Sequence, residues 1–187
     1  AQKNLQENAG FRLLGNFSKL QKDNNYKIFD IIAYSNLASD LHFSIQDINV
    51  EILKNIDRPD VGWDVHLAMA NKLREKYPHF TIKAQLIYGL PGQTAASWRN
   101  TLEEVTKHNF MPMCFLNEPL PASPAVYDPE YQRKFQFQYV YSTRLDGDVS
   151  YQSNIPKNSS SFDQKDIVEM TILSAFYWTL VAINSIL

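Results

Sequence analysis

Residues 86–94 read LIYGLPGQT, and this stretch decides the fold because an apolar run stops there at a glycine-rich turn and a helical pattern begins. The run that enters the turn, FTIKAQLIY at residues 80–88, is rich in β-branched and aromatic side chains, which predicts a strand buried in a parallel sheet. Beyond the turn, Trp98 and Leu102 recur at helical spacing, with Thr94 as the expected N-cap. The stretch therefore predicts a strand–turn–helix unit of an α/β fold.

The glycines of this turn allow two interpretations. Gly89 and Gly92 let the backbone come close to a ligand at the carboxyl end of the strand, where α/β sheets and barrels place their active sites. The same turn can also be a plain tight connection. A phosphate-binding loop is excluded, because Gln93 stands where that motif needs a lysine followed by serine or threonine.

The alternation of strands and helices extends along most of the chain. Strands are expected at residues 11–17, 41–45, 80–88 and about 112–116, and helices at residues 24–37, along residues 65–73 and after residue 94. This spacing is typical of βαβ units and predicts a parallel sheet or part of an α/β barrel. Four strands cannot close an eight-stranded barrel.

The pattern changes beyond Tyr127. A turn is expected at residues 146–148 and a polar loop at residues 154–161, followed by a long apolar helix whose start resembles a capping box formed by Ser161 and Gln164. The last 18 residues contain no charged side chain, a length near the minimum for crossing a bilayer. Interspersed hydroxyl and amide side chains and the lack of a following Lys or Arg favour packing onto the domain or onto further partner sequence over insertion.

Composition limits the function further. The 187 residues are 44% hydrophobic, enough for a real core in about one domain. With 18 basic and 20 acidic residues and no long run of one sign, no nucleic-acid partner is expected. The single Cys114 excludes a disulfide framework and, with no signal peptide at the start, suits the cytoplasm. No catalytic or zinc set is predicted from the four scattered histidines, His42, His66, His79 and His108.

Polar residues gather where the expected strands end. The candidates are Asn16, Ser18, Lys19, Ser44, Gln46, Tyr88, Gly89, Gln93, Asn117 and Glu118. Ser44 and Gln46 are two residues apart on an extended segment, so both should face one side and could bond one ribose or carboxylate. The alternative is that such residues only satisfy loop backbone. Hydroxyl and amide groups of this kind suit a nucleoside-like ligand better than proton transfer.

Four segments, in order, resemble the radical S-adenosylmethionine superfamily. They are SIQDINVEILKNIDRP at residues 44–59, LIYGLPGQT, NEPLPASPAVYDPEY at residues 117–131, and SFDQKDIVEM at residues 161–170 with the helix after it. The resemblance is strongest to the branch in which a cobalamin-binding domain precedes the barrel. Turns like LIYGLPGQT also occur in the radical enzymes that oxidise coproporphyrinogen, so that branch stays open.

The resemblance implies a fold and a cofactor. Residues 1–127 would be strands three to six of a (β/α) TIM-like barrel, and residues 128–187 a C-terminal extension that ends in the apolar helix. Members of the superfamily use a 4Fe–4S cluster to cleave S-adenosylmethionine reductively, which yields methionine and a 5′-deoxyadenosyl radical that abstracts hydrogen from the substrate. The branch also implies cobalamin and methyl transfer.

The resemblance also assigns roles to candidate residues. Ser44 and Gln46 would meet the ribose or carboxylate of S-adenosylmethionine, and Lys19 a carboxylate. The adenine would lie against the backbone of Tyr88, Gly89 and Leu90, together with Asn117.

One departure from the family is large. Members hold the cluster with a Cys-x3-Cys-x2-Cys loop, and this chain has one cysteine, whereas such a cluster needs three or four converging thiolates. The cluster loop is therefore expected upstream in the same protein, which makes this chain a fragment that is inactive alone. Two other hypotheses stay open: a non-catalytic half-barrel that serves binding or assembly, and a membrane-anchored protein defined by its last helix.

Overall fold

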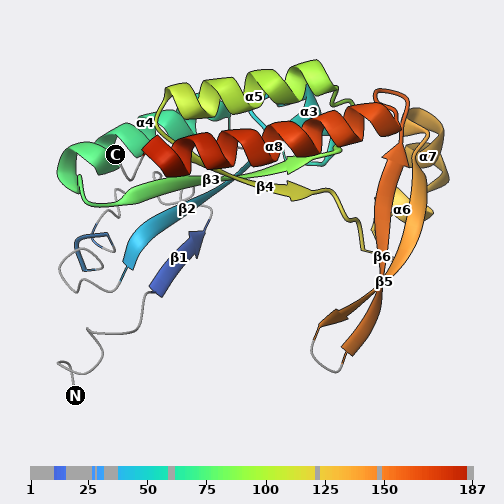
Figure 1. Cartoon of the computed structure of the whole chain (residues 1–187), viewed down its shortest axis with the longest axis horizontal. Helices are drawn as coiled ribbons and strands as arrows, with labels where there is room; N and C mark the ends of the chain where they lie inside the picture. The colour runs from blue at the N-terminus through green and yellow to red at the C-terminus, as the bar shows by residue number, and fades with distance from the viewer. Residues whose placement is uncertain are drawn as a thin grey trace.

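The centre of the molecule is a parallel sheet. The structure is a computed structural model that describes residues 11–15, 27, 29–31, 38–58, 62–120, 123–146 and 149–184. Four parallel strands lie in the order β1-β2-β3-β4 (Figure 1): β1 (Phe11–Gly15), β2 (Ala38–Gln46), β3 (Thr81–Tyr88) and β4 (Met111–Leu116). Each of the four strands confirms a predicted one. Spatial order follows chain order, as in a barrel and unlike a doubly wound sheet.

Helices cover one face of this sheet. After β2 come α3 (Val50–Asn55) and α4 (Trp63–Lys76), and after β3 comes α5 (Ala95–Lys107). Figure 1 shows α4, α5 and the last helix, α8 (Gln164–Asn184), on the same side of the sheet, where α5 and α8 contact each other. The expected helix at residues 24–37 falls mostly outside the described residues, although Lys27 and residues 29–31 are helical.

The core lies between the sheet and these helices. Every second residue of β3 is buried, and the side chains between them are partly exposed. The buried side chains under the helices include Leu41, Phe43, Ile45, Ile82, Ala84, Leu86, Met69, Leu73, Trp98, Leu102 and Val105. This alternation gives the sheet one apolar face and one polar face.

The start of α5 is the one that the sequence predicts. The Thr94 hydroxyl accepts a hydrogen bond from the Ser97 N–H at 3.1 Å, and the Ser97 hydroxyl accepts one from the Thr94 N–H at 2.9 Å. This reciprocal capping box fixes where the chain leaves the turn and enters the helix.

The tail contains a hairpin that the sequence does not predict. Two short helices, α6 (Pro124–Tyr127) and α7 (Pro129–Phe135), precede the antiparallel strands β5 (Gln138–Asp146) and β6 (Val149–Asn158). The expectation of a polar loop at residues 154–161 is therefore wrong for residues 154–158. Ser153 and Asn154 are polar but buried, because both bond to the loop that follows β4. The domain boundary at residue 127 stays a prediction.

The N-terminus of α8 also differs from the prediction. The Asp163 carboxylate accepts hydrogen bonds from the N–H groups of Lys165 and Asp166, and the Asp166 carboxylate accepts one from the Asp163 N–H. Ser161 bonds to Ser159 instead. The capping residue is therefore Asp163, whose negative charge also suits a helix N-terminus.

Helix α8 packs on the domain. It contacts α5 and β4, and the Trp98 indole N–H lies 3.2 Å from both the Met170 carbonyl and the Ser174 hydroxyl. Residues 164–183 are long and apolar enough to cross a membrane by length and composition, the one such helix in the described part of the chain. Its outward face exposes large apolar side chains, among them Ile172 and Phe176. Membrane contact stays untested.

The Trp98 bonds should matter for the docking of α8. We expect Trp98→Phe to lower the free energy of unfolding by about 1–2 kcal/mol, because it removes a buried donor to this helix. Chemical denaturation followed by circular dichroism measures the loss. The control is Trp178→Phe, the same change at a half-exposed position on α8. Equal losses in the two variants would contradict a specific role for Trp98.

His66 is a buried titratable group in this core. It lies on α4, 2% exposed, with its ring centroid 6.0 Å from that of Phe43. Burial lowers the pKa of His66 from 6.5 to about 4. The unfolded chain therefore binds a proton that the folded protein excludes between these pH values.

Stability should consequently depend on pH through His66. The stabilisation from neutral His66 is fully present above pH 6.5 and is lost as the pH falls toward about 4, where the loss reaches about 3 kcal/mol. Unfolding free energies measured from pH 7.5 to 4 test this. His66→Leu should flatten the profile across that range, whereas His79→Leu, at an exposed position, should keep the wild-type slope.

Candidate functional site

The turn after β3 is organised by a buried pair of polar side chains. The Gln93 amide donates to the Asp47 carboxylate at 2.6 Å, and both residues are fully buried. Asp47 also accepts hydrogen bonds from the Asn49 N–H at 2.8 Å and the Thr101 hydroxyl at 3.2 Å. One carboxylate thus connects the end of β2, the turn after β3, and α5.

Gln93 in turn holds the backbone of the turn. Its carbonyl oxygen accepts the N–H groups of Gly89 at 2.7 Å and Leu90 at 3.2 Å, and its amide also donates to the Ile87 carbonyl at 3.2 Å. The side chain therefore closes a local hydrogen-bond ring. Two backbone donors at the carboxyl end of β3 are used inside the protein.

The carbonyl groups of the turn are also bonded. The Asn117 amide donates to the Gly89 carbonyl at 3.0 Å, while the Asn117 N–H donates to the Tyr88 carbonyl at 2.8 Å. The Asn55 amide donates to the Pro91 carbonyl at 3.0 Å. The loop after β4 and the end of α3 are thereby fixed to the same turn.

Both turn glycines have conformations that side chains rarely adopt, with φ of +78° at Gly89 and +86° at Gly92. A Cβ on Gly89 would lie 3.3 Å from Ile167 of α8, and one on Gly92 would lie 2.8 Å from the Asn55 amide nitrogen. The turn is therefore packed beneath the tail on one side. Space and conformation both require glycine here.

Burial is the main influence on the charge of Asp47. It raises the pKa of this carboxyl above its usual value, against the opposing effect of the bonds from Asn49, Gln93 and Thr101. The three donors stabilise the carboxylate where water cannot reach it. This arrangement suits a structural role.

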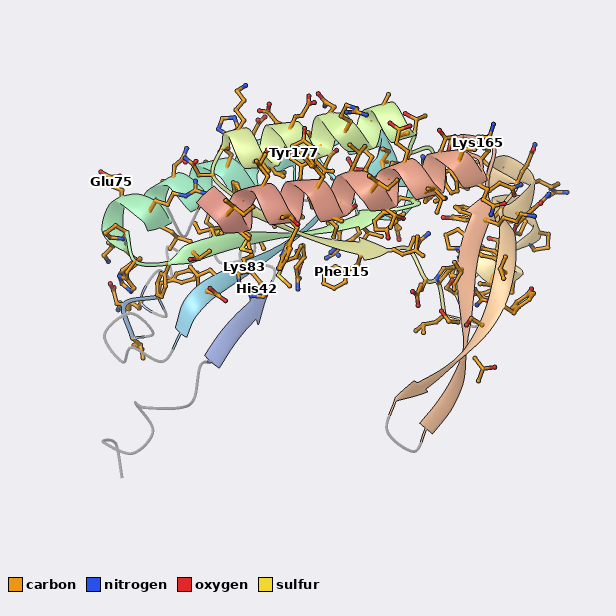
Figure 2. All side chains as sticks on the ribbon, in the orientation of Figure 1. His42, Glu75, Lys83, Phe115, Lys165 and Tyr177 are labelled. Carbon is orange, nitrogen blue, oxygen red and sulfur yellow. The ribbon has the colours of Figure 1, made fainter. Side chains whose placement is uncertain are left out.

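The polar face of the sheet is the one without helices. Lys83 and Asp40 form an ion pair there, and the Ser44 hydroxyl donates to the Gln85 side chain at 2.9 Å. Figure 2 shows Lys83 and Phe115 on the side of the sheet away from α4, α5 and α8. In a barrel this face would be the interior.

A cavity of about 420 Å³ lies at the carboxyl edge, between the end of α3, the loop after β4 and the two short helices. Its polar lining includes Asn55, Asp57, Asn117 and Tyr131, and its apolar lining includes Ile56, Pro119, Pro124 and Ala125. Burial raises the pKa of the Tyr131 hydroxyl from 10 to about 12. The size lies within the range of small-molecule sites.

The predicted site residues are only partly brought together. Asn117 lines the cavity and bonds Gly89, but Ser44 and Gln46 are not among the cavity residues. A bulge between Ser44 and Gln46, with φ of 69° at Gln46, breaks the simple alternation that would place both on one face. Lys19 lies outside the described residues.

Three other candidates, Tyr88, Gly89 and Leu90, make their contacts within the protein itself. The Tyr88 ring packs on the helix side, 5.6 Å from Trp98, and its hydroxyl lies 3.4 Å from that of Thr171. The Gly89 and Leu90 N–H groups are bonded to Gln93. Their assigned contacts with adenine stay predictions.

The structure adds residues that the sequence does not single out. Asp47, Asn55 and Tyr131 are far apart along the chain, and only the folded arrangement shows what they contact. Gln93 is visible in the sequence as a polar residue beside the glycines. A polar side chain between a turn and a helix often bonds the backbone of the turn, and this is the one sign in the sequence of the role of Gln93.

The residues present do not fit an iron–sulfur cluster. In the ranges that the structure describes, no group of three or more His, Cys, Asp or Glu side chains is placed to hold a metal ion. Burial raises the pKa of Cys114 to about 12, and it lies against α8 with Ser174 as a neighbour. A single thiol packed against α8 cannot hold a cluster, because a cluster needs three or four converging thiolates.

Gln93 should be more important for stability than an ordinary polar residue. We expect Gln93→Ala to lower the free energy of unfolding by about 2–4 kcal/mol, because two N–H groups and the Asp47 carboxylate lose their partner. The control is Gln85→Ala on the polar face of β3, which removes one partly buried bond and should cost about 1 kcal/mol or less. Urea denaturation compares them, and similar losses would refute the argument.

Comparison with known proteins gives relatives of named activity. No family model matches the chain. A threonylcarbamoyladenosine tRNA methylthiotransferase of Thermotoga maritima is 31% identical over 124 residues, which is 64% of this chain and 28% of that protein. A tRNA-2-methylthio-N(6)-dimethylallyladenosine synthase of Corynebacterium urealyticum is 32% identical over 107 residues, 57% of this chain and 20% of that protein. The chain thus spans less than a third of the length of these relatives.

A solved structure supports the fold. Coproporphyrinogen III oxidase from Escherichia coli, described as a radical SAM enzyme, superposes with a TM-score of 0.56 over 96% of this chain and 36% of its own, at 19% identity. The order of the four parallel strands agrees with this similarity, so the predicted partial α/β barrel is confirmed. The resemblance to the radical S-adenosylmethionine superfamily that the sequence predicts is likewise confirmed.

Proposed function

We propose that this chain is the S-adenosylmethionine-binding part of a radical enzyme and supplies strands three to six of its barrel. The observation that carries the proposal is the cavity at the carboxyl edge of the sheet, lined by Asn117 from the exit of β4. Active sites of barrels lie at this edge. The solved structure of similar fold is that of a radical SAM enzyme.

The cavity suits the nucleoside part of the cofactor. The backbone N–H and the side-chain amide nitrogen of Asn117 donate hydrogen bonds to the Tyr88 and Gly89 carbonyls. Its side-chain oxygen is then left as an acceptor for a ligand. An exocyclic amino group of adenine is a donor of matching chemistry. Ile56 and Pro119 offer apolar surface for a flat ring. Ser44 and Gln46 stay our candidates for the ribose or carboxylate, and Lys19 for a carboxylate.

The cluster that cleaves the cofactor would be held by sequence outside this chain. The superfamily uses three cysteines for it, and this chain contains one. We therefore propose that the chain alone is inactive and that upstream sequence of the same protein completes the site. A cytoplasmic location follows as part of this proposal, because a reducing compartment preserves thiolate ligands.

The reaction that the radical serves is the finer part of the proposal. Both relatives reported above are named for methylthio groups on tRNA, so transfer of such a group is the outcome that they favour. The charge of the chain predicts no nucleic-acid partner, whereas the names of these relatives refer to tRNA. Binding of tRNA should therefore be measured. Cobalamin-dependent methyl transfer has no support from these names. Oxidation of a coproporphyrinogen-like substrate has the support of fold alone.

A non-catalytic half-barrel stays the alternative. It would use the same polar face and cavity for binding or assembly, without a cluster. The coding sequence upstream of Ala1 discriminates between the two. The enzyme proposal requires a Cys-x3-Cys-x2-Cys motif there, and its absence would favour the binding module.

Asn117 provides the direct test. In the protein that carries this chain, purified anaerobically, Asn117→Ala should weaken binding of S-adenosylmethionine about tenfold, measured by isothermal titration calorimetry. Asn117→Asp keeps acceptor oxygens but loses the bond to Gly89, and so separates ligand contact from turn support. Asn100→Ala, an exposed change on α5, is the control. Unchanged affinity in Asn117→Ala would reject the assignment.

A further inference from the structure

We propose that the β5–β6 hairpin positions the loop after β4 for ligand binding, with Ser153 and Asn154 as the positioning residues. The inference rests on the function proposed above, because that loop carries Asn117. Neither Ser153 nor Asn154 lines the cavity, so both would act through the loop rather than on the ligand.

Two consecutive residues of β6 hold two consecutive residues of the loop. The Ser153 hydroxyl donates to the Glu118 carboxylate at 2.7 Å, and the Asn154 amide donates to the Pro119 carbonyl at 2.9 Å. Ser153 and Asn154 are only 4% and 2% exposed. Because buried polar groups need partners, the hairpin and the loop each fix the conformation of the other.

The position of these bonds along the loop is the important point. Asn117 and Pro119 both line the cavity, and Glu118 stands between them. One bond from β6 holds the residue between the two cavity residues, and the other holds the carbonyl of Pro119 itself. A shift of β6 would therefore move Glu118 and Pro119, the two residues that directly follow Asn117 in the loop.

Asn117 fixes the start of this loop to the turn after β3, and the bonds from β6 hold the two residues that follow it. The loop has left the sheet after β4, and Pro119 has no N–H to donate. Ordering free loop residues on ligand binding costs about 1–2 kcal/mol for each backbone. A loop already held by the hairpin avoids much of that cost when the ligand arrives.

The hairpin also supports a second wall of the cavity. The Tyr139 hydroxyl of β5 donates to the Ala125 carbonyl of α6 at 2.9 Å, and Ala125 lines the cavity. Directly opposite Tyr139 in the hairpin, Pro156 of β6 lies close to Gly89. Both strands thus connect the cavity walls to the turn after β3. Figure 1 shows α6 and α7 beside the upper part of this hairpin.

The test is a double-mutant cycle on S-adenosylmethionine binding. In the complete protein, purified anaerobically, Ser153→Ala and Glu118→Ala should each weaken binding about five- to tenfold, measured by isothermal titration calorimetry. The double variant should bind no more weakly than Glu118→Ala, because the Ser153–Glu118 bond is lost in all three variants. Ser153→Thr, which keeps the hydroxyl, should restore the wild-type affinity.

The control is Thr143→Ala, which removes a hydroxyl from an exposed position of the same hairpin and should leave affinity unchanged. Melting temperatures recorded alongside separate loop positioning from loss of fold. If Ser153→Ala does not fold, Glu118→Ala breaks the same bond from the loop side and decides the question.

The outcomes distinguish the two proposals. If the wild type binds S-adenosylmethionine and Ser153→Ala and Glu118→Ala bind it equally well, the positioning role is overturned. The proposed function then still stands. Additive losses in the double variant also overturn it, because independent effects do not come from one shared bond. A wild-type protein with its cluster that fails to bind S-adenosylmethionine overturns the proposed function, and the positioning role with it.

Discussion

The hydrogen bond between the buried side chains of Gln93 and Asp47 is the constraint on which the rest of this structure depends. A sharp turn at the carboxyl end of a buried strand leaves backbone groups that neither the sheet nor the next helix can bond. Gln93 bonds the N–H groups of Gly89 and Leu90, and Asp47 holds Gln93 in place. Because Asp47 also bonds Thr101, the position of α5 relative to β2 follows from the same carboxylate.

Covering this turn explains why the tail folds back over the barrel portion. Ile167 of α8 and Pro156 of β6 both pack closely against Gly89, so a side chain there would require Ile167 to move by a few tenths of an ångström. Trp98, which follows the turn on α5, bonds α8 through the Met170 carbonyl. The tail and the sheet therefore share one core, and the long apolar helix has a packed side as well as an exposed one.

The sequence predicts the strands well because each buried strand is an apolar run between polar turns, and residues 80–88 show this most clearly. It fails at the hairpin, where Ser153 and Asn154 are polar and yet buried. Their partners, Glu118 and Pro119, lie 35 residues away along the chain, so no local pattern reveals the pairing. The cavity cannot be predicted for the same reason, because its walls come from α3, the loop after β4, and α6–α7, which are far apart along the chain.

The internal hydrogen bonds of the glycine turn change what LIYGLPGQT can contribute to ligand binding. The sequence alone allows a ligand-facing backbone there as well as a plain tight connection, but the N–H groups of Gly89 and Leu90 and the carbonyls of Gly89 and Pro91 are bonded within the protein. A rigid turn cannot adapt to a ligand, although it can hold other groups at fixed positions. Selectivity at this edge must then come from side chains that the turn supports. Asn117 has such a side chain. Its backbone and side-chain nitrogen atoms donate hydrogen bonds to the turn, and its side-chain oxygen is left to bind a ligand.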